Sequence, residues 1–136
     1  MTTIVSAYDG YCIDINNNDV SNGVKLVLGT CDSSSSQSWW LNDDGSISSS
    51  LDSNKCIGVE GSVYAHYTPI EIQDCDSGNP AQQWNYLADG TIQSVGDPSY
   101  CFDGNGLNSV VYLWHCDGTS DQYWTYVGPT TPIPSV

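Results

Sequence analysis

A pattern of cysteine and tryptophan that occurs three times constrains the fold of this 136-residue chain more than any other feature. Each copy contains a first cysteine, a second cysteine 15 or 19 residues later, and a Gln-x-Trp triplet whose Trp follows the second cysteine by eight or nine residues. The copies begin at Cys12, Cys56 and Cys101, which are 44 and 45 residues apart. A period in this range is typical of repeat architectures. The sequence therefore predicts one domain of three equivalent units.

A fourth shared element indicates how the three units close on one another. After the first two Gln-x-Trp triplets comes Asp-Gly, which favours a hairpin turn, and then Ile-x-Ser at residues 47–49 and 92–94. The third copy has no such element after Trp124, but Ile-Val-Ser stands at residues 4–6. The isoleucine of this triplet precedes the first cysteine of the chain by eight residues. We therefore predict that the N-terminal strand completes the third repeat.

The local pattern predicts β-structure throughout. Short runs rich in β-branched or aromatic residues, such as 24–28, 70–73 and 110–113, are bounded by Gly, Asn, Asp or Pro, and no longer window keeps a helical period. Three repeats of about four strands each give an all-β domain of about twelve strands, which we place at residues 1–128. The Pro/Thr-rich residues 129–136 are expected to form a tail or the start of a linker.

The acidic composition narrows the classes of partner. Sixteen Asp and Glu against two Lys and no Arg give a net charge of −14, so phosphate backbones and anionic membranes are both disfavoured. No apolar run approaches the roughly 20 residues that span a bilayer, and the N-terminus does not resemble a signal peptide. We attribute the acidity to solubility. Calcium binding is the alternative, but the Asp-rich runs resemble turns and no EF-hand loop is present.

The cysteines point to a structural role outside the cytosol. There are six, an even number, and none lies in a Cys-x-x-Cys pair, which predicts a disulfide framework and a secreted protein. His66 and His115 are far apart in sequence, so a zinc site is disfavoured. We expect neither a metal nor a cofactor.

Taken together, these motifs resemble the ricin B-type lectins, also classed as family 13 carbohydrate-binding modules. The pattern is Cys-x-Asp, a second Cys and Gln-x-Trp; it covers nearly the whole chain short of the tail and departs at Gly58, which stands where the second copy should have Asp. The resemblance implies a β-trefoil, a barrel capped by three hairpins, with at most one shallow sugar pocket per repeat. It also implies three disulfides, each within one repeat: Cys12–Cys31, Cys56–Cys75 and Cys101–Cys116. Three tryptophans are expected to fill the core: Trp39, Trp84 and Trp124.

The third repeat carries the full set of residues that the family uses for sugar. In this family the Asp two residues after the first Cys accepts hydrogen bonds from adjacent sugar hydroxyls, and an aromatic two residues before the second Cys stacks on the apolar face of the ring. An Asn before the Gln usually completes the pocket. The candidate site residues are Asp103, Tyr112, Trp114, His115, Asp121 and Gln122.

Asp121 departs from the family because it stands where Asn is usual. Two carboxylates at one pocket raise one pKa or recruit a cation. Our hypothesis is that Asp121 weakens the binding of neutral sugars at pH 7, or makes it depend on pH or on a cation.

The other two repeats are less complete. Repeat one keeps Asp14, Ser36 and Gln37 as a candidate second site, but Gly29 takes the place of the aromatic platform. Repeat two has Gly58 in place of the carboxylate and Gln73 in place of the platform. Three side chains in its loop either stack on a sugar or pack against the protein, and both interpretations stay open: Tyr64, His66 and Tyr67.

The sequence therefore predicts a non-catalytic lectin domain that binds galactose- or N-acetylgalactosamine-type glycans or glycoproteins, mainly through repeat three. We find no Gly-x-Ser-x-Gly motif or phosphate loop, although Asp103 and Asp121 could be mistaken for the carboxylate pair of a glycosidase. Two alternatives stay open: a module from a larger secreted glycoside hydrolase that targets xylan or arabinan, and a protein-binding or protease-inhibitor trefoil. A linked catalytic module or a homo-oligomer also stays open.

Overall fold

The computed structural model describes residues 1–128 and shows an all-β fold of three four-stranded sheets. The strands are β1 (Thr3–Ser6), β2 (Cys12–Ile15), β3 (Leu26–Gly29), β4 (Trp39–Leu41), β5 (Ile47–Ser49), β6 (Lys55–Val59), β7 (Ile70–Asp74), β8 (Trp84–Tyr86), β9 (Ile92–Ser94), β10 (Tyr100–Asp103), β11 (Tyr112–His115) and β12 (Trp124–Val127). Short 3-10 turns lie between them: η1 (Asn16–Asn18), η2 (Ser35–Gln37), η3 (Glu60–Ser62), η4 (Pro80–Gln82) and η5 (Ser120–Gln122).

The sheets repeat one antiparallel strand order around the molecule. They run β12-β1-β2-β3, β4-β5-β6-β7 and β8-β9-β10-β11, with the middle pair of each sheet joined at few positions. In the first sheet β1 pairs with β12 in the register Ile4↔Tyr126. The first strand of the chain thus pairs with the last, which confirms that the N-terminus supplies the strand that the third repeat lacks.

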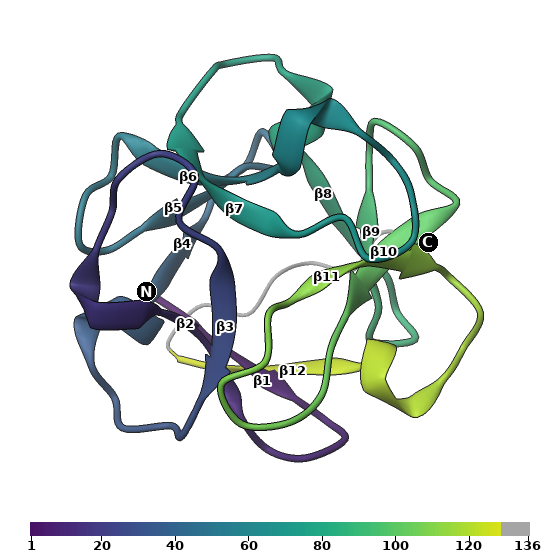
Figure 1. Ribbon diagram of the computed structural model, residues 1–136, viewed down its shortest axis with the longest axis horizontal. Coiled ribbons are helices and arrows are strands. Elements are labelled where there is room, and N and C mark those ends of the chain that lie inside the picture. The colour runs from purple at the N-terminus through teal and green to yellow at the C-terminus, as the bar shows by residue number, and fades with distance from the viewer. Residues whose placement is uncertain (129–136) are drawn as a thin grey trace.

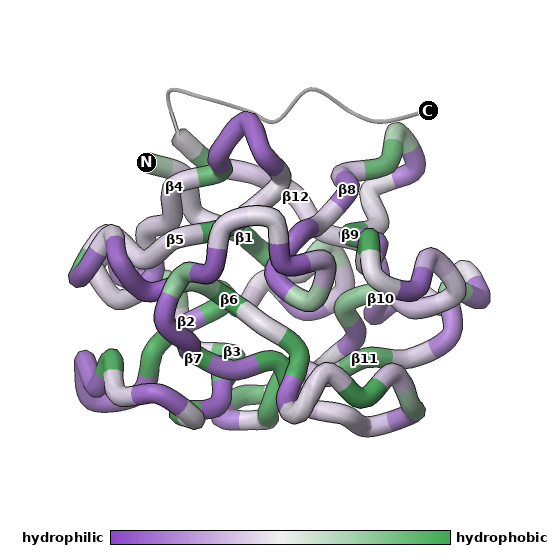
Figure 2. The backbone as a smooth tube through the Cα atoms, turned by 90° about the horizontal axis from the view of Figure 1, so that it is seen from above, coloured by the Kyte–Doolittle hydropathy of each residue, from purple (hydrophilic) through white to green (hydrophobic). Residues whose placement is uncertain are grey.

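Three lobes surround a common centre, where β3, β7 and β11 come together (Figure 1). Figure 2 shows these strands toward one end of the molecule, with β4, β8 and β12 toward the other. The loop before each of β3, β7 and β11 donates a backbone hydrogen bond to the corresponding strand of the next repeat: Gly23 to Ile72, Tyr67 to Leu113 and Asn108 to Leu28. Neighbouring repeats are therefore joined through equivalent loops.

The three Gln-x-Trp tryptophans occupy the core, as predicted. Trp39, Trp84 and Trp124 are at most 2% exposed, and each indole N–H donates to a backbone carbonyl of the preceding Cys-containing strand. A buried indole needs such a partner for its N–H group. The large rings fill the interior, and the hydrogen bonds fix their orientation.

The cysteines form the three predicted links, one within each repeat: Cys12–Cys31, Cys56–Cys75 and Cys101–Cys116. Each closes a short loop and contributes about 3 kcal/mol in the chain-entropy model. Over residues 1–128, no helix is long and apolar enough to cross a membrane. The tail that we predict at residues 129–136 lies outside the described residues.

Candidate binding site in the third repeat

Asp103 is the centre of the candidate site and is held almost out of contact with solvent. It is 4% exposed, and one carboxylate oxygen, Oδ2, accepts a hydrogen bond of 3.1 Å from Nε2 of Gln122. The other oxygen, Oδ1, is buried and has no hydrogen-bond partner among the described residues. A buried acceptor without a partner costs free energy. The site therefore contains a carboxylate oxygen whose hydrogen-bonding capacity the described residues leave unused.

Gln122 fixes this carboxylate because its own amide is fully engaged. Its Oε1 accepts from the backbone N–H groups of Asp117 and Gly118 at 3.1 and 3.3 Å. Its Nε2 donates to the carbonyl of His115 at 2.6 Å as well as to Asp103. The glutamine of the Gln-x-Trp motif thus orients the carboxylate and ties η5 to β10 and β11.

Burial raises the pKa of Asp103 to about 6, against an opposing effect of the Gln122 hydrogen bond. The negative charges of Asp121 and Asp117 raise it further. Asp121 is held in place because its carboxylate accepts from Nδ2 of Asn105 at 2.8 Å and from Oγ1 of Thr119 at 3.0 Å. Asp103 therefore titrates close to neutral pH, with Asp121 as one of the causes.

The aromatic part of the site lies on β11. Asp103 is directly opposite Tyr112, and Cys101 is opposite Trp114, so alternate residues of the two strands place Trp114 on the face that carries the carboxylate. Burial, with the nearby charge of Asp103, raises the pKa of Tyr112 to about 12. Its phenol therefore keeps its proton and can donate a hydrogen bond at neutral pH.

A histidine from the second repeat covers one face of the Trp114 indole. The His66 ring is stacked on it at 3.8 Å between centroids, with an angle of 10° between the planes. A sugar therefore cannot stack on this face of the indole. The ring of His115 packs beside those of His66 and Tyr100, and its backbone carbonyl accepts from Gln122. The structure thus places the six predicted residues on β10, β11 and η5, next to one another: Asp103, Tyr112, Trp114, His115, Asp121 and Gln122.

Repeat one has the carboxylate and the glutamine but no platform. Oδ2 of Asp14 accepts from Nε2 of Gln37 at 3.1 Å, and Oδ1 is buried without a hydrogen-bond partner in the described chain. Ser36 is buried and shares a hydrogen bond with Ser34. A Cβ atom at Gly29 would lie 2.5 Å from Oδ2 of Asp14, so the carboxylate fills the space beside this glycine.

Repeat two replaces the carboxylate with a neutral amide, which sequence reasoning missed. Oε1 of Gln73 accepts from Nε2 of Gln82 at 3.0 Å, and its Nε2 donates to the Val59 carbonyl and to Glu71. A side chain on Gly58 would collide with Gln73. The glutamine that we read as a missing platform therefore reaches across β6 into the place of the aspartate and occupies the pocket.

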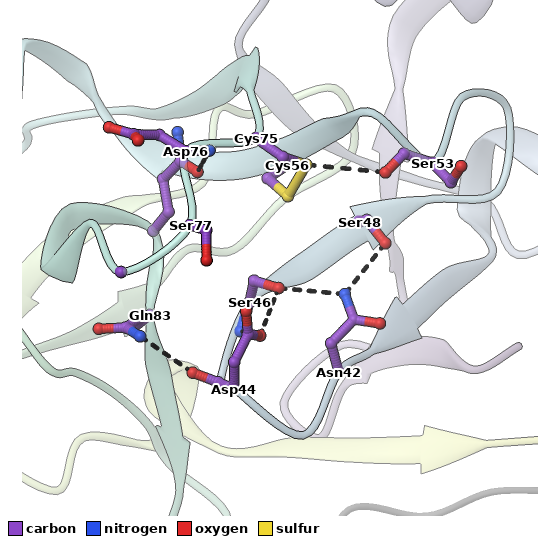
Figure 3. A pocket seen from close by; sticks show the side chains of 12 residues that line it. Asn42, Asp44, Ser46, Ser48, Ser53, Cys56, Cys75, Asp76, Ser77 and Gln83 are labelled. Atoms are coloured by element: carbon purple, nitrogen blue, oxygen red, sulfur yellow. Dashed lines mark hydrogen bonds between the residues drawn. A yellow bond between two sulfur atoms is a disulfide. The ribbon is translucent and has the colours of Figure 1, made fainter.

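A separate cavity of about 240 Å³ lies between the β4–β5 hairpin and the Cys56–Cys75 disulfide (Figure 3). Serine, asparagine, glutamine and aspartate side chains line it, and no aromatic ring does. We do not take it as the candidate site because it offers a sugar ring nothing on which to stack. Over the described residues, no group of three or more His, Cys, Asp or Glu side chains is arranged to hold a metal.

Comparison with known families agrees with the geometry. Residues 1–124 match the ricin-type beta-trefoil lectin domain. The chain belongs to this family. The three sheets, the three disulfides and the Gln-x-Trp motifs all belong to this ricin-type domain. The domain is of the carbohydrate-binding lectin type.

Two similar proteins illustrate the match. The Viscum album protein beta-galactoside-specific lectin 3 is 33% identical over 107 residues, which are 76% of this chain and 18% of that protein. A non-toxic homologue of type II RIPs from Momordica charantia, in complex with alpha-methyl-D-galactoside, has a TM-score of 0.75 and 25% identity, and the match covers 92% of this chain and 46% of that one.

The earthworm R-type lectin C-half, solved in complex with GalNAc, has a TM-score of 0.74 at 21% identity and covers 92% of this chain and 95% of that one; this similarity supports the fold alone. The chain spans less than a fifth of the length of the curated relatives that it matches. The match to these relatives is therefore a match of one domain. Its three disulfides are typical of proteins that fold in an oxidising, extracellular environment.

Proposed function

We propose that this ricin-type domain binds galactose- or N-acetylgalactosamine-type glycans, without catalysis, mainly through its third repeat. The observation that carries the proposal is the Asp103 carboxylate, with one oxygen fixed by Gln122 and the other buried and unpaired. Trp114 is on the same face of the β10–β11 hairpin. A neutral sugar can donate a hydroxyl to the carboxylate while its C–H face lies on the indole.

The relatives favour a galactoside. A protein 33% identical to this chain is named a beta-galactoside-specific lectin, and a structural neighbour at 25% identity was solved with a methyl galactoside. With few hydrogen bonds and one stacking surface, we expect a millimolar Kd for a monosaccharide, about −4 kcal/mol. Useful avidity then requires several sites, either in a longer protein or in an oligomer.

The surroundings of Asp121 support a binding role. A glycosidase needs one carboxylate that donates a proton and a second that attacks or activates water across the scissile bond. Asp121 is instead occupied by Asn105 and Thr119. We infer a secreted domain whose partners are glycans or glycoproteins, and any catalysis by a longer protein would belong to another of its domains.

A glycan array with the purified domain tests this proposal, followed by titration of each hit with Asp103→Ala and Trp114→Ala. We expect galactosides among the hits, with binding weakened at least about tenfold in both variants. The matched control is Trp40→Ala, because Trp40 is an exposed tryptophan of repeat one and should leave binding unchanged. Inhibition of proteases without any glycan binding would instead favour the protein-binding trefoil.

A further inference from the structure

Three equivalent backbone positions, one per repeat, adopt a left-handed conformation. Gly23, Tyr67 and Asn108 each lie eight residues before the second cysteine of their repeat, with φ values of 91°, 67° and 66°. Each donates its N–H to a carbonyl of the next repeat, at 2.8, 3.0 and 2.7 Å. The fold therefore requires a positive φ at this position, because these bonds join the repeats.

Glycine and asparagine suit this conformation, and tyrosine does not. Glycine has no Cβ to clash, and asparagine is enriched in the left-handed region, whereas a bulky aromatic residue there is a strained outlier. Burial does not repay the strain, because Tyr67 is 66% exposed. An aromatic ring at this position of repeat two thus costs stability without serving the core.

Tyr67 lies beside the one repeat that carries the complete candidate site. On one edge, β11 pairs with β10, which carries Asp103. On its other edge, Leu113 exchanges backbone hydrogen bonds with Tyr67 and Thr68, so the loop before β7 borders the platform strand (Figure 1). The Tyr67 ring is 4.8 Å from that of Trp114 and 5.0 Å from that of Tyr112, between centroids.

We infer that Tyr67 forms a second saccharide subsite, so that the third repeat binds a disaccharide or longer glycan across the boundary between repeats. This inference rests on the proposed function: one sugar ring is held by Asp103 and Trp114, and the adjoining ring contacts the exposed Tyr67 ring. An exposed aromatic side chain offers such a stacking surface and a hydroxyl at its tip. A strained conformation kept at the rim of a site is expected where the residue serves a ligand.

The neighbouring residue supports the same arrangement. His66 is stacked on Trp114 at 3.8 Å, so two consecutive residues of the repeat-two loop contact the platform of repeat three. The equivalent positions in the other loops are Asn22 and Leu107. The loop of repeat two is therefore the one that extends an aromatic surface toward the neighbouring repeat.

The test compares two probes on the unaltered domain and on Tyr67→Asn, which installs the residue that repeat three uses at the same backbone position. The probes are methyl β-galactoside and a set of galactosyl disaccharides linked through O3, O4 or O6 of the second sugar. We expect at least one disaccharide to bind about five- to tenfold more tightly than the monosaccharide, by titration calorimetry or NMR. In Tyr67→Asn this gain should vanish while the affinity for methyl galactoside changes less than twofold.

A thermal melt separates a ligand role from a structural one. Tyr67→Asn should keep or raise the Tm because it relieves strain, and the reverse control Asn108→Tyr should lower it. A lower Tm for Tyr67→Asn, or an equal loss for both probes, would overturn the inference. Normal binding of methyl galactoside with no gain for any disaccharide would overturn this inference alone. No binding of methyl galactoside by the unaltered domain would contradict the proposed function and the inference together.

Discussion

Repeats two and three share a scaffold, but the motif glutamine holds a neutral amide in repeat two and a carboxylate in repeat three. In both, the glutamine of the Gln-x-Trp motif donates to an oxygen from the β6–β7 or β10–β11 hairpin. In repeat three that oxygen belongs to Asp103, whose second oxygen is buried and unpaired. In repeat two it belongs to Gln73, whose amide is already hydrogen-bonded on both sides. The motif glutamine is thus part of the scaffold, and the residue that it holds decides whether a pocket has an unused acceptor.

The largest expected effect comes from making the acceptor of repeat three neutral, as it is in repeat two. Asp103→Asn should weaken galactoside binding by about 30- to 100-fold, because hydrogen bonds to a charged acceptor contribute about 1.5–3 kcal/mol each. The amide oxygen can still accept from Gln122, so the fold should persist. Titration calorimetry measures the loss, and Asp76→Asn, an exposed aspartate of repeat two, serves as the control. Equal affinities of Asp103→Asn and the unaltered domain would exclude the carboxylate as the anchor.

Removing the stacking surface should have the next largest effect. Trp114→Ala is expected to weaken binding by about tenfold or more, since the apolar contact of the sugar ring with an indole contributes about 1–2 kcal/mol. Trp40 is 45% exposed on β4 and offers a matched tryptophan away from the site. Intrinsic fluorescence during a galactoside titration can follow both variants. A full response in Trp114→Ala and none in Trp40→Ala would place the ligand elsewhere.

Acidification should weaken binding and stabilise the fold at the same time. The pKa of Asp103 is raised to about 6 from an ordinary value of 3.8. Binding should fall about tenfold between pH 7 and pH 5 as the acceptor is protonated. The folded state binds the proton more tightly than the unfolded state, so the contribution of Asp103 to the free energy of unfolding decreases as the pH rises from about 4 to above 6.

Chemical denaturation of the unaltered domain and of Asp103→Asn across this range isolates the contribution of this residue, because other titrating groups are common to both. The difference in the free energy of unfolding between the two proteins should grow as the pH rises, with Asp103→Asn the more stable at pH 7. A difference that does not change with pH would contradict the burial of a titrating carboxylate. Repeat two has no such group at the equivalent position and should add nothing to the difference.

A smaller effect is expected from Asp121→Asn. The charge of Asp121 is one of the causes that raise the pKa of Asp103, so its removal should lower that pKa and tighten galactoside binding at pH 6 by up to about twofold, because about half of the Asp103 carboxyls are already ionised there. Asn can still accept a hydrogen bond from Thr119. At pH 7.5 the gain should be smaller, since Asp103 is already ionised there. Tighter binding of the unaltered protein at both pH values would reverse our hypothesis for this residue.

The smallest effect on binding should come from repeat two. Gln73→Ala removes hydrogen bonds to Gln82, Val59 and Glu71, so we expect a loss of about 1–2 kcal/mol in the free energy of unfolding. Galactoside affinity should change less than twofold. Denaturant melts and calorimetry read the two effects separately. A marked loss of affinity would show that repeat two takes part in binding.

The repeat spacing made the fold predictable, because identical short motifs at a fixed period specify identical strands and links. The boundaries were less accurate: the run at residues 110–113 became β11 (Tyr112–His115), and Val110 instead forms an isolated bridge with Val27. Such bridges join repeats around the centre, and no local pattern within one repeat encodes them.

The candidate site was only partly predictable for the same reason. Asp103 and Gln122 could be found because they stand at fixed offsets from the cysteines. The replacement of an aspartate by Gln73 depends on a side chain that crosses to the neighbouring strand over Gly58. The contacts of His66 and Tyr67 with Trp114 join repeats two and three. The one signal in the sequence for these contacts was the pair His66-Tyr67, because the equivalent positions in the loops of the other two repeats hold Asn-Gly and Leu-Asn.

The most direct test of the account is an NMR titration of the five tryptophan indole N–H signals with methyl galactoside. Three of these groups donate to buried backbone carbonyls, those of Trp39, Trp84 and Trp124, and should barely respond. We predict that the Trp114 signal shifts with a millimolar midpoint, that it does not shift in Asp103→Asn, and that the Trp40 signal stays fixed. Saturable shifts confined to residues around Gln73 or Gly29, with Trp114 unchanged, would contradict the central claim that repeat three holds the sugar.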